Sequence, residues 1–222
     1  MPTTLFGSGA GDGGVYRNAA ETWTALRTAT DGTSVGDTDP ENNSPAANGT
    51  GEATGAEIRR GFLGFDLSSI AGATVSAGGL TLTNHNSVFS NNSDTQSYNL
   101  YEGTQASMSA LATSDLDNFG TTALATAIAF TDIPTDGSKE WVLNTDGTTL
   151  ATSKAGTNFK LCFRISADYT TVAPTAGTTN SIRVMWSESA SPPSLSLTYT
   201  LGGGGGKRTL PVRAMGRGLM IP

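Results

Sequence analysis

Apolar and polar residues alternate in several short segments of the chain, a pattern typical of half-buried β-strands. The clearest case is the segment 159–165 (FKLCFRI), where every second residue is large and apolar and Lys160, Cys162 and Arg164 lie between them. The same period of two relates Ile182, Val184 and Trp186, and also Leu195, Leu197 and Tyr199. Further candidate strands are 3–6, 14–17, 22–28, 63–67, 80–82, 98–101 and 141–143.

Clusters of Gly, Ser, Asn and Asp separate these segments. About ten short strands joined by such turns predict an all-β fold, a two-sheet β-sandwich with long loops whose inner faces supply the core. The stretches 106–116 and 121–129 have helix-friendly content, and we expect one helical turn around Met108–Leu111. The segment Asp31–Gly55 has Val35 as its only large apolar residue. That composition predicts an excursion on the surface, outside the core.

Charge, cysteine content and the absence of long apolar runs limit the expected partners and the expected cellular compartment. The segment 207–222 carries +4 and the whole chain −6, so residues 1–206 carry −10. An acidic body argues against binding of a nucleic-acid backbone by the sandwich. Cys162 is the only cysteine, so an intrachain disulfide cannot form. Because the sequence shows neither a signal-peptide pattern nor an apolar run of about 18 residues, we expect folding in a cytosol without a membrane span.

The segment 202–222 (GGGGGKRTLPVRAMGRGLMIP), which we call the basic arm, differs from the domain expected over residues 1–201. The five consecutive glycines at its start are flexible, and ordering the segment costs about 1–2 kcal/mol per residue in backbone entropy. It cannot bury its own apolar side chains, so we expect a groove on another subunit to receive it. The expected partner-binding residues are Lys207, Arg208, Leu210, Val212, Arg213, Met215, Arg217, Leu219, Met220 and Ile221. An engineered linker and packing on the acidic body are the alternatives.

Candidate catalytic groups are few. His85 is the only histidine and follows a candidate strand, with no nucleophile motif beside it. Cys162 has Lys160 and Arg164 as neighbours, which would activate a thiol, but the simpler interpretation is a small residue that fills space. The glycines of 9–14 (GAGDGG) match the dinucleotide-binding pattern GxGxxG, yet the next residues continue as a strand instead of a helix. The sequence therefore predicts no enzyme.

Loop carboxylates give only a weak metal signal. The candidate oxygen ligands for calcium are Asp12, Asp37, Asp39, Asp115 and Asp117. Their spacing does not match an EF-hand loop, so solvated turn residues are the favoured interpretation. No cofactor is predicted, and structural calcium stays an alternative.

Three separated motifs occur in order along the chain. The first, 59–70 (RRGFLGFDLSSI), is an arginine-containing strand that ends in Phe-Asp-Leu-Ser and is followed by a small-residue turn and alternating leucines. The others are 141–144 (WVLN), which precedes a glycine-containing turn, and 192–199 (PPSLSLTY). Together they resemble the DNRLRE-type family over roughly residues 3–201. The resemblance implies a jelly-roll-like sandwich similar to carbohydrate-binding modules, found on secreted adhesive proteins and on phage particles.

The first motif also has a physical interpretation that needs no ligand. Asp66 is expected to accept backbone N–H groups in the turn that leaves the strand. Arg59 or Arg60 is expected to pair with Asp66 or with a neighbouring carboxylate. These residues are therefore expected to serve the fold.

A glycan-binding site needs aromatic faces on a groove beside polar groups. Trp141 and Trp186 lie in apolar alternations and are expected in the core. Trp23 and Tyr101 lie outside such strict patterns and are the candidate glycan-binding residues.

Two functional hypotheses follow. The leading one is a non-enzymatic structural protein of a bacteriophage virion, assembled in the host cytoplasm. It would be a capsid decoration or cement protein, or a tail or fibre component, anchored by residues 202–222 to the major capsid protein or another virion protein. Symmetric self-association, for example as a trimer, would suit a capsid. The alternative is a carbohydrate-binding module that mediates adhesion to glycans.

Overall fold

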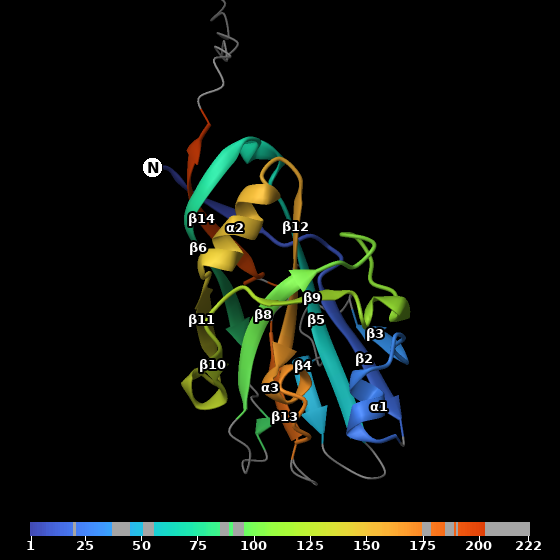
Figure 1. The fold of residues 1–222 in the computed structure, drawn as a ribbon. Coiled ribbons are helices and arrows are strands. Elements are labelled where there is room, and N and C mark those ends of the chain that lie inside the picture. The colour runs from blue at the N-terminus through green and yellow to red at the C-terminus, as the bar shows by residue number, and fades with distance from the viewer. Residues whose placement is uncertain are drawn as a thin grey trace, which may run out of the picture.

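Two antiparallel sheets pack together in the part of the chain that the computed structural model describes, residues 1–19, 21–36, 45–50, 56–84, 89–90, 96–174, 179–184, 189 and 191–202 (Figure 1). The smaller sheet consists, in order, of β1 (Thr3–Gly7), β14 (Ser194–Leu201), β6 (Ala73–Asn84) and β11 (Gly137–Val142). The all-β sandwich predicted from the sequence is confirmed.

The larger sheet is organised around the long strand β5. Its order is β10 (Ile128–Ala129), β8 (Ser97–Gly103), β12 (Asn158–Ile165), β5 (Ala56–Asp66), β4 (Pro45–Thr50), β13 (Thr179–Arg183) and β7 (Phe89–Ser90). Three more strands pair beside this path: β2 (Gly13–Ala19) with β5, β3 (Ser34–Gly36) with β2, and β9 (Phe119–Ala123) with β8. The register sets Phe62 of β5 opposite Cys162 of β12.

The main core lies between the two sheets. Trp141 of β11 is 1% exposed, and its indole N–H donates to the Tyr98 carbonyl of β8 at 3.1 Å. The Trp141 ring meets the Phe163 ring of β12 edge to face, with centroids 5.0 Å apart. Tyr98 stacks on Phe163 with ring centroids 5.5 Å apart. The alternating apolar residues of 159–165 and 195–199 point into this core, as predicted.

A second, smaller core covers the outer face of the larger sheet. Its buried members are Val15, Phe62, Tyr101, Leu111, Leu116 and Cys162. The loop 104–118 contributes Leu111 and Leu116 to this core, so this face of the sheet is not simply solvated. Every residue from Leu161 to Ile165 is buried, because β12 has an apolar layer on both of its faces. Strict alternation in the sequence did not reveal this second layer.

Helical segments differ from the prediction. Thr22–Thr28 is not a strand: it contains helix α1 (Trp23–Arg27), and the Thr22 hydroxyl caps it by accepting the Ala25 N–H at 3.3 Å. No helical turn forms around Met108–Leu111; the nearest is the 3₁₀ turn η2 (Thr113–Asp115). The remaining helical elements are α2 (Thr145–Ser153), α3 (Ser166–Tyr169), η1 (Ser68–Ile70) and η3 (Phe130–Asp132).

The segment 31–55 is more regular than its composition suggested. Its residues 34–36 form β3 and residues 45–50 form β4. Backbone pairing needs no apolar side chains, and β4 joins β5 and β13 through main-chain bonds. The rest of the excursion, 37–44 and 51–55, lies outside the described residues.

Candidate functional site

Two arginines on the outer face of the larger sheet share one buried carboxylate. Arg60 comes from β5, two residues before Phe62, and Arg164 from β12, two residues after Cys162. Arg60 donates from Nε and Nη2 to the two carboxylate oxygens of Asp168, both at 2.8 Å. Arg164 donates from Nε to Asp168 at 2.6 Å. The single turn α3 follows β12 directly, which places Asp168 four residues after Arg164.

Arg60 also ties peripheral segments to the sheet. Its Nη1 donates to the Leu116 carbonyl at 2.8 Å and its Nη2 to the Arg27 carbonyl at 2.7 Å. The guanidinium lies 4.6 Å from the centre of the Phe119 ring. A buried charge is tolerated only when its donors are paired, and Arg60, which is 0% exposed, meets that condition.

The hydrogen bonds expected for the first motif form, although the carboxylate that pairs with Arg60 is distant in sequence. Asp66 accepts the Ser68 N–H at 2.8 Å, and this bond lowers the pKa of Asp66. The arginines pair with other carboxylates: Arg59 with Glu57 at 2.6 Å, and Arg60 with Asp168. The motif therefore serves the fold, as expected.

Burial and the neighbouring arginines together set the pKa values of Asp168 and Cys162 in this cluster. Burial alone would raise the pKa of Asp168, but the charge of Arg60 and the hydrogen bonds from both arginines lower it below its ordinary value. Burial raises the pKa of the Cys162 thiol to about 12, so the neighbouring arginines do not activate it. Cys162 is 0% exposed and fills space in the second core.

A hollow of about 360 Å³ opens beside this cluster, and we call it the arginine hollow. Its lining residues are Arg27, Thr28, Tyr101, Asp117, Phe119, Thr121, Arg164 and Tyr169. Arg164 lies 4.0 Å from the Phe119 ring centre and 4.9 Å from that of Tyr101. Cations stack favourably on aromatic faces, so the two rings and Asp168 hold this guanidinium in one orientation.

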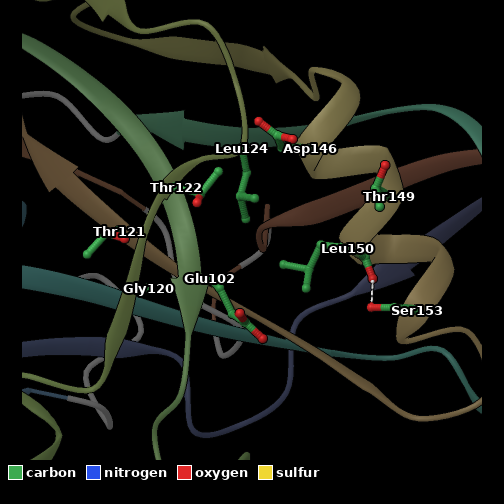
Figure 2. A pocket seen from close by; sticks show the side chains of 9 residues that line it. All are labelled: Glu102, Gly120, Thr121, Thr122, Leu124, Asp146, Thr149, Leu150 and Ser153. Atoms are coloured by element: carbon green, nitrogen blue, oxygen red, sulfur yellow. Dashed lines mark hydrogen bonds between the residues drawn. The ribbon is translucent and has the colours of Figure 1, made fainter.

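A second hollow of about 440 Å³ lies between β9 and α2, and we call it the α2 hollow (Figure 2). Its lining residues are Glu102, Gly120, Thr121, Thr122, Leu124, Asp146, Thr149, Leu150 and Ser153. Two carboxylates and four hydroxyls surround two leucines, and Leu150 extends from α2 toward the strands in Figure 2. The arrangement offers both acceptors and donors around a small apolar surface.

Local sequence explains how α2 reaches this position. Asn144 caps the helix by accepting the Gly147 N–H at 2.9 Å, and its own amide donates to the Ala123 carbonyl at 2.9 Å. A Cβ at Gly147 would overlap the Leu124 carbonyl, so glycine permits the close approach of helix and strand. The Thr152 hydroxyl accepts the Val75 N–H of β6 at 2.9 Å.

A third hollow, of about 410 Å³, lies next to the α2 hollow. It is lined by Glu102, Gly103, Thr104, Lys154, Thr157, Asn158 and Lys160. Glu102 lines both this hollow and the α2 hollow and pairs with Lys154 at 3.0 Å. Thr121 lines both the α2 hollow and the arginine hollow. The α2 hollow therefore adjoins both of the other hollows.

The two aromatic residues predicted to contact glycans are both buried. Trp23 is 8% exposed, and its indole N–H donates to the Ala167 carbonyl at 3.3 Å. Tyr101 is 4% exposed, but it lines the arginine hollow. The expectation that these rings lie outside the core is wrong for both, because α1 packs the Trp23 indole into the main core and Tyr101 belongs to the second core. Trp186 lies outside the described residues.

Other predicted site residues have structural roles or fall outside the described part. Asp115 accepts the N–H groups of Ala106 and Ala112, at 3.1 and 2.9 Å. Asp12 is buried and accepts the Ser8 hydroxyl. Within 9–14, residues 10–11 form a turn and β2 begins at Gly13, so no helix follows. Among the described residues no group of three or more potential metal-binding side chains occurs. His85, Asp37, Asp39 and the arm residues from Gly203 onward are not described.

The chain is classified by its fold, a two-sheet all-β sandwich. No model of a known protein family and no curated protein matches the sequence. Within the described ranges, none of the helices is long and apolar enough to cross a bilayer.

Proposed function

We propose that the chain is a non-enzymatic structural protein of a bacteriophage virion, attached to its partner by the basic arm. The observation that carries the proposal is the contrast between a body of charge −10 and a following segment of charge +4 that is rich in glycine and apolar residues. Opposite charges of this size favour association with an acidic surface, and apolar side chains that the arm cannot bury alone favour a groove. The resemblance to DNRLRE-type domains on phage particles agrees with this role.

The point where the arm leaves the sandwich suits an anchor. β14 lies between β1 and β6, so main-chain bonds hold it on both sides. Immediately after it, the Gly202 N–H donates to the Gly72 carbonyl at 3.1 Å. A load applied to the arm would therefore pass into the interior of the smaller sheet instead of detaching an edge strand. In this role the arm binds the major capsid protein or another virion protein, and a decoration protein would act as a symmetric oligomer.

Removal of residues 203–222 should abolish attachment and leave the sandwich folded. Gly202 is retained because its amide is bonded to Gly72. We expect the melting temperature to change little, and we expect the truncated chain to be missing from particles purified from cells that produce the virus encoding it. Mass spectrometry of those particles measures the second quantity.

Two variants of the full chain separate the contributions of charge and apolar contact. One replaces Lys207, Arg208, Arg213 and Arg217 with Gln; the other replaces Leu210, Val212, Leu219 and Ile221 with Ser. Loss of attachment in both variants fits a basic-apolar anchor. A full-length chain that is absent from purified particles, or a truncated chain that still joins them, would contradict the proposal.

A second function, binding of glycans, is favoured by the chemistry of the α2 hollow. Sugars present hydroxyl groups around an apolar ring face. The carboxylates of Glu102 and Asp146 are acceptors for hydrogen bonds from hydroxyl groups, and Leu124 and Leu150 supply apolar contact. The volume of about 440 Å³ lies within the range of small-molecule sites.

Filling the α2 hollow should abolish glycan binding. Thr149 lines the hollow from α2, so the substitution Thr149→Tyr places a ring in the space. Thr145→Tyr is the matched control, because Thr145 is exposed on the same helix and does not line the hollow. A glycan array probed with the full chain identifies ligands, and calorimetry compares the variants. Equal affinity of both variants for an identified neutral glycan, or an array without any bound glycan, would overturn this second function.

A further inference from the structure

The arginine hollow contains a guanidinium without a partner among the described residues. Arg27 is in the last turn of α1, and it lines the hollow. No hydrogen bond or ion pair joins its side chain to any residue that the structure describes, and its Nε is buried without an acceptor. The Arg27 carbonyl, in contrast, accepts from Arg60 at 2.7 Å, so the backbone here is fixed. An N–H group buried without an acceptor is costly, and an anionic ligand would supply acceptors for this guanidinium.

Arg164 presents a second, oriented guanidinium to the same hollow. Its one hydrogen bond among described residues is from Nε to Asp168, and the rings of Phe119 and Tyr101 fix its plane. Its Nη1 and Nη2 groups therefore have no acceptor in this part of the chain. A planar guanidinium with free Nη donors matches the geometry of a carboxylate.

The local charge has the opposite sign to that of the body. Arg27, Arg60 and Arg164 bring three positive charges to the hollow and its wall, whereas Asp117 and Asp168 bring two negative ones. Asp168 is already shared by two arginines, and Asp117 is 3.9 Å from Arg60 with its side chain 48% exposed. One positive charge remains in a body of charge −10. Such an excess favours a single anionic group over a polyanion, which the surrounding acidic surface would repel.

The other lining residues suit a ligand whose ring carries polar groups. The volume of about 360 Å³ is at the small end of ligand sites. Thr28 and Thr121 provide hydroxyls, and the half-buried Tyr169 provides an aromatic side chain whose ring centroid is 5.6 Å from that of Tyr101. Thr121 also lines the α2 hollow, where the glycan site is proposed.

We propose that the arginine hollow binds the carboxylate of a uronic acid unit through Arg27 and Arg164. The assignment rests on the glycan-binding function proposed above and specifies its ligand as an acidic glycan. The neutral part of the glycan would occupy the α2 hollow across Thr121.

Calorimetric titration with a galactose oligomer that carries a single galacturonate unit, and with the matched oligomer of galactose alone, tests the assignment. We expect the acidic oligomer to bind the unmodified full chain at least about tenfold more tightly than the neutral one, as for a hydrogen-bonded charge. The substitution Arg27→Gln should remove most of this difference. Its fold should persist, because only the side chain changes and the carbonyl that Arg60 contacts is kept. Lys139→Gln, on β11 of the other sheet, makes the same charge change and should leave the difference intact.

Each alternative outcome has a defined meaning. If neutral and acidic oligomers bind equally, or if Arg27→Gln and Lys139→Gln behave alike, the uronic acid site is wrong while glycan binding stands. If neither oligomer binds, the uronic acid site is wrong, and the glycan array decides the wider function. Acetate that competes as strongly as galacturonate would show recognition of a carboxylate alone and overturn the sugar assignment. Shifts of the Arg27 and Arg164 Nε–H signals in NMR spectra with galacturonate, absent with galactose, would support it.

Discussion

Replacement of Asp168 by Asn is expected to destabilise the sandwich by about 3–5 kcal/mol, the usual cost of removing one partner from a buried ion pair. The neutral amide would leave Arg60, which is 0% exposed, and Arg164, which is 5% exposed, without a counter-charge. The amide would keep one acceptor oxygen and place an NH₂ donor where the other oxygen was, so it could not accept all three bonds that join β5, β12 and α3. Urea unfolding at pH 7 measures the change in the free energy of unfolding.

Asp117→Asn is the matched control for this change. Asp117 also faces Arg60, but at 3.9 Å and with its side chain 48% exposed. A pair so open to solvent contributes about 0–1 kcal/mol. Similar losses for the two variants would contradict the view that burial of the Asp168 cluster makes it important.

The same residue should make the sandwich sensitive to acid. The folded state lowers the pKa of Asp168 below the value of about 3.9 expected for an unfolded aspartate. A lowered pKa means that ionised Asp168 stabilises the fold fully above about pH 4, and that this stability is lost as the pH falls through the folded value. The Asp168→Asn variant should show a smaller decline of stability between about pH 5 and the acid range than the unmodified chain.

Replacement of Trp141 by Ala is expected to cost about 3–5 kcal/mol. The indole is 1% exposed, lies edge to face on Phe163 and donates to the Tyr98 carbonyl, so its loss leaves a cavity and removes this hydrogen bond. The cavity would separate β11 from β8, which belong to different sheets. The shift in the midpoint of urea unfolding measures the effect.

The next residue of the same strand provides the control. Val142 points to the other face of β11 and is 62% exposed. Val142→Ala should change the free energy of unfolding by no more than about 0.5 kcal/mol. If both substitutions destabilise the chain equally, the placement of the core between the sheets is incorrect.

The strands could be predicted where one face of a strand meets the core. Leu195, Leu197 and Tyr199 lie inside, as their spacing indicated, and β14 extends over them. The prediction of a half-buried strand failed for residues 159–165, where a second apolar layer covers the outer face. Cys162 and Arg164 are small or polar, and they are nevertheless buried. That layer comes from residues such as Leu111 and Leu116 in a loop, and no periodic pattern identifies a loop as a cover.

Helix α2 illustrates another limit of sequence patterns. Its sequence, TDGTTLATS, contains a glycine and several β-branched threonines, which are weak helix formers. The helix forms because Asn144 caps it, Gly147 permits close contact with Leu124, and Thr152 contacts β6. The contacts with Leu124 and β6 are tertiary, so the segment by itself indicated a turn.

The candidate site was the hardest feature to predict. Arg60 and Asp168 are 108 residues apart, and only the spacing of Arg164 and Asp168 offered a local signal. The arginine hollow draws its lining from α1, β8, β9, β12 and α3. Tyr101 was chosen from the sequence and does line it, although as a buried ring beneath Arg164 and not as an exposed platform.

The pairing of the first strand with the last has a consequence for how the chain folds. Thr3 lies opposite Thr198, and β14 separates β1 from β6 in the smaller sheet. The smaller sheet therefore cannot form completely during synthesis until residues 194–201 have been made. Until then β1 lacks β14, the strand with which it pairs in this sheet. Pairing across such sequence distances makes folding slow and leaves strand edges open to other nascent chains. Expression at reduced temperature and low rates of synthesis should accordingly favour recovery of the native fold.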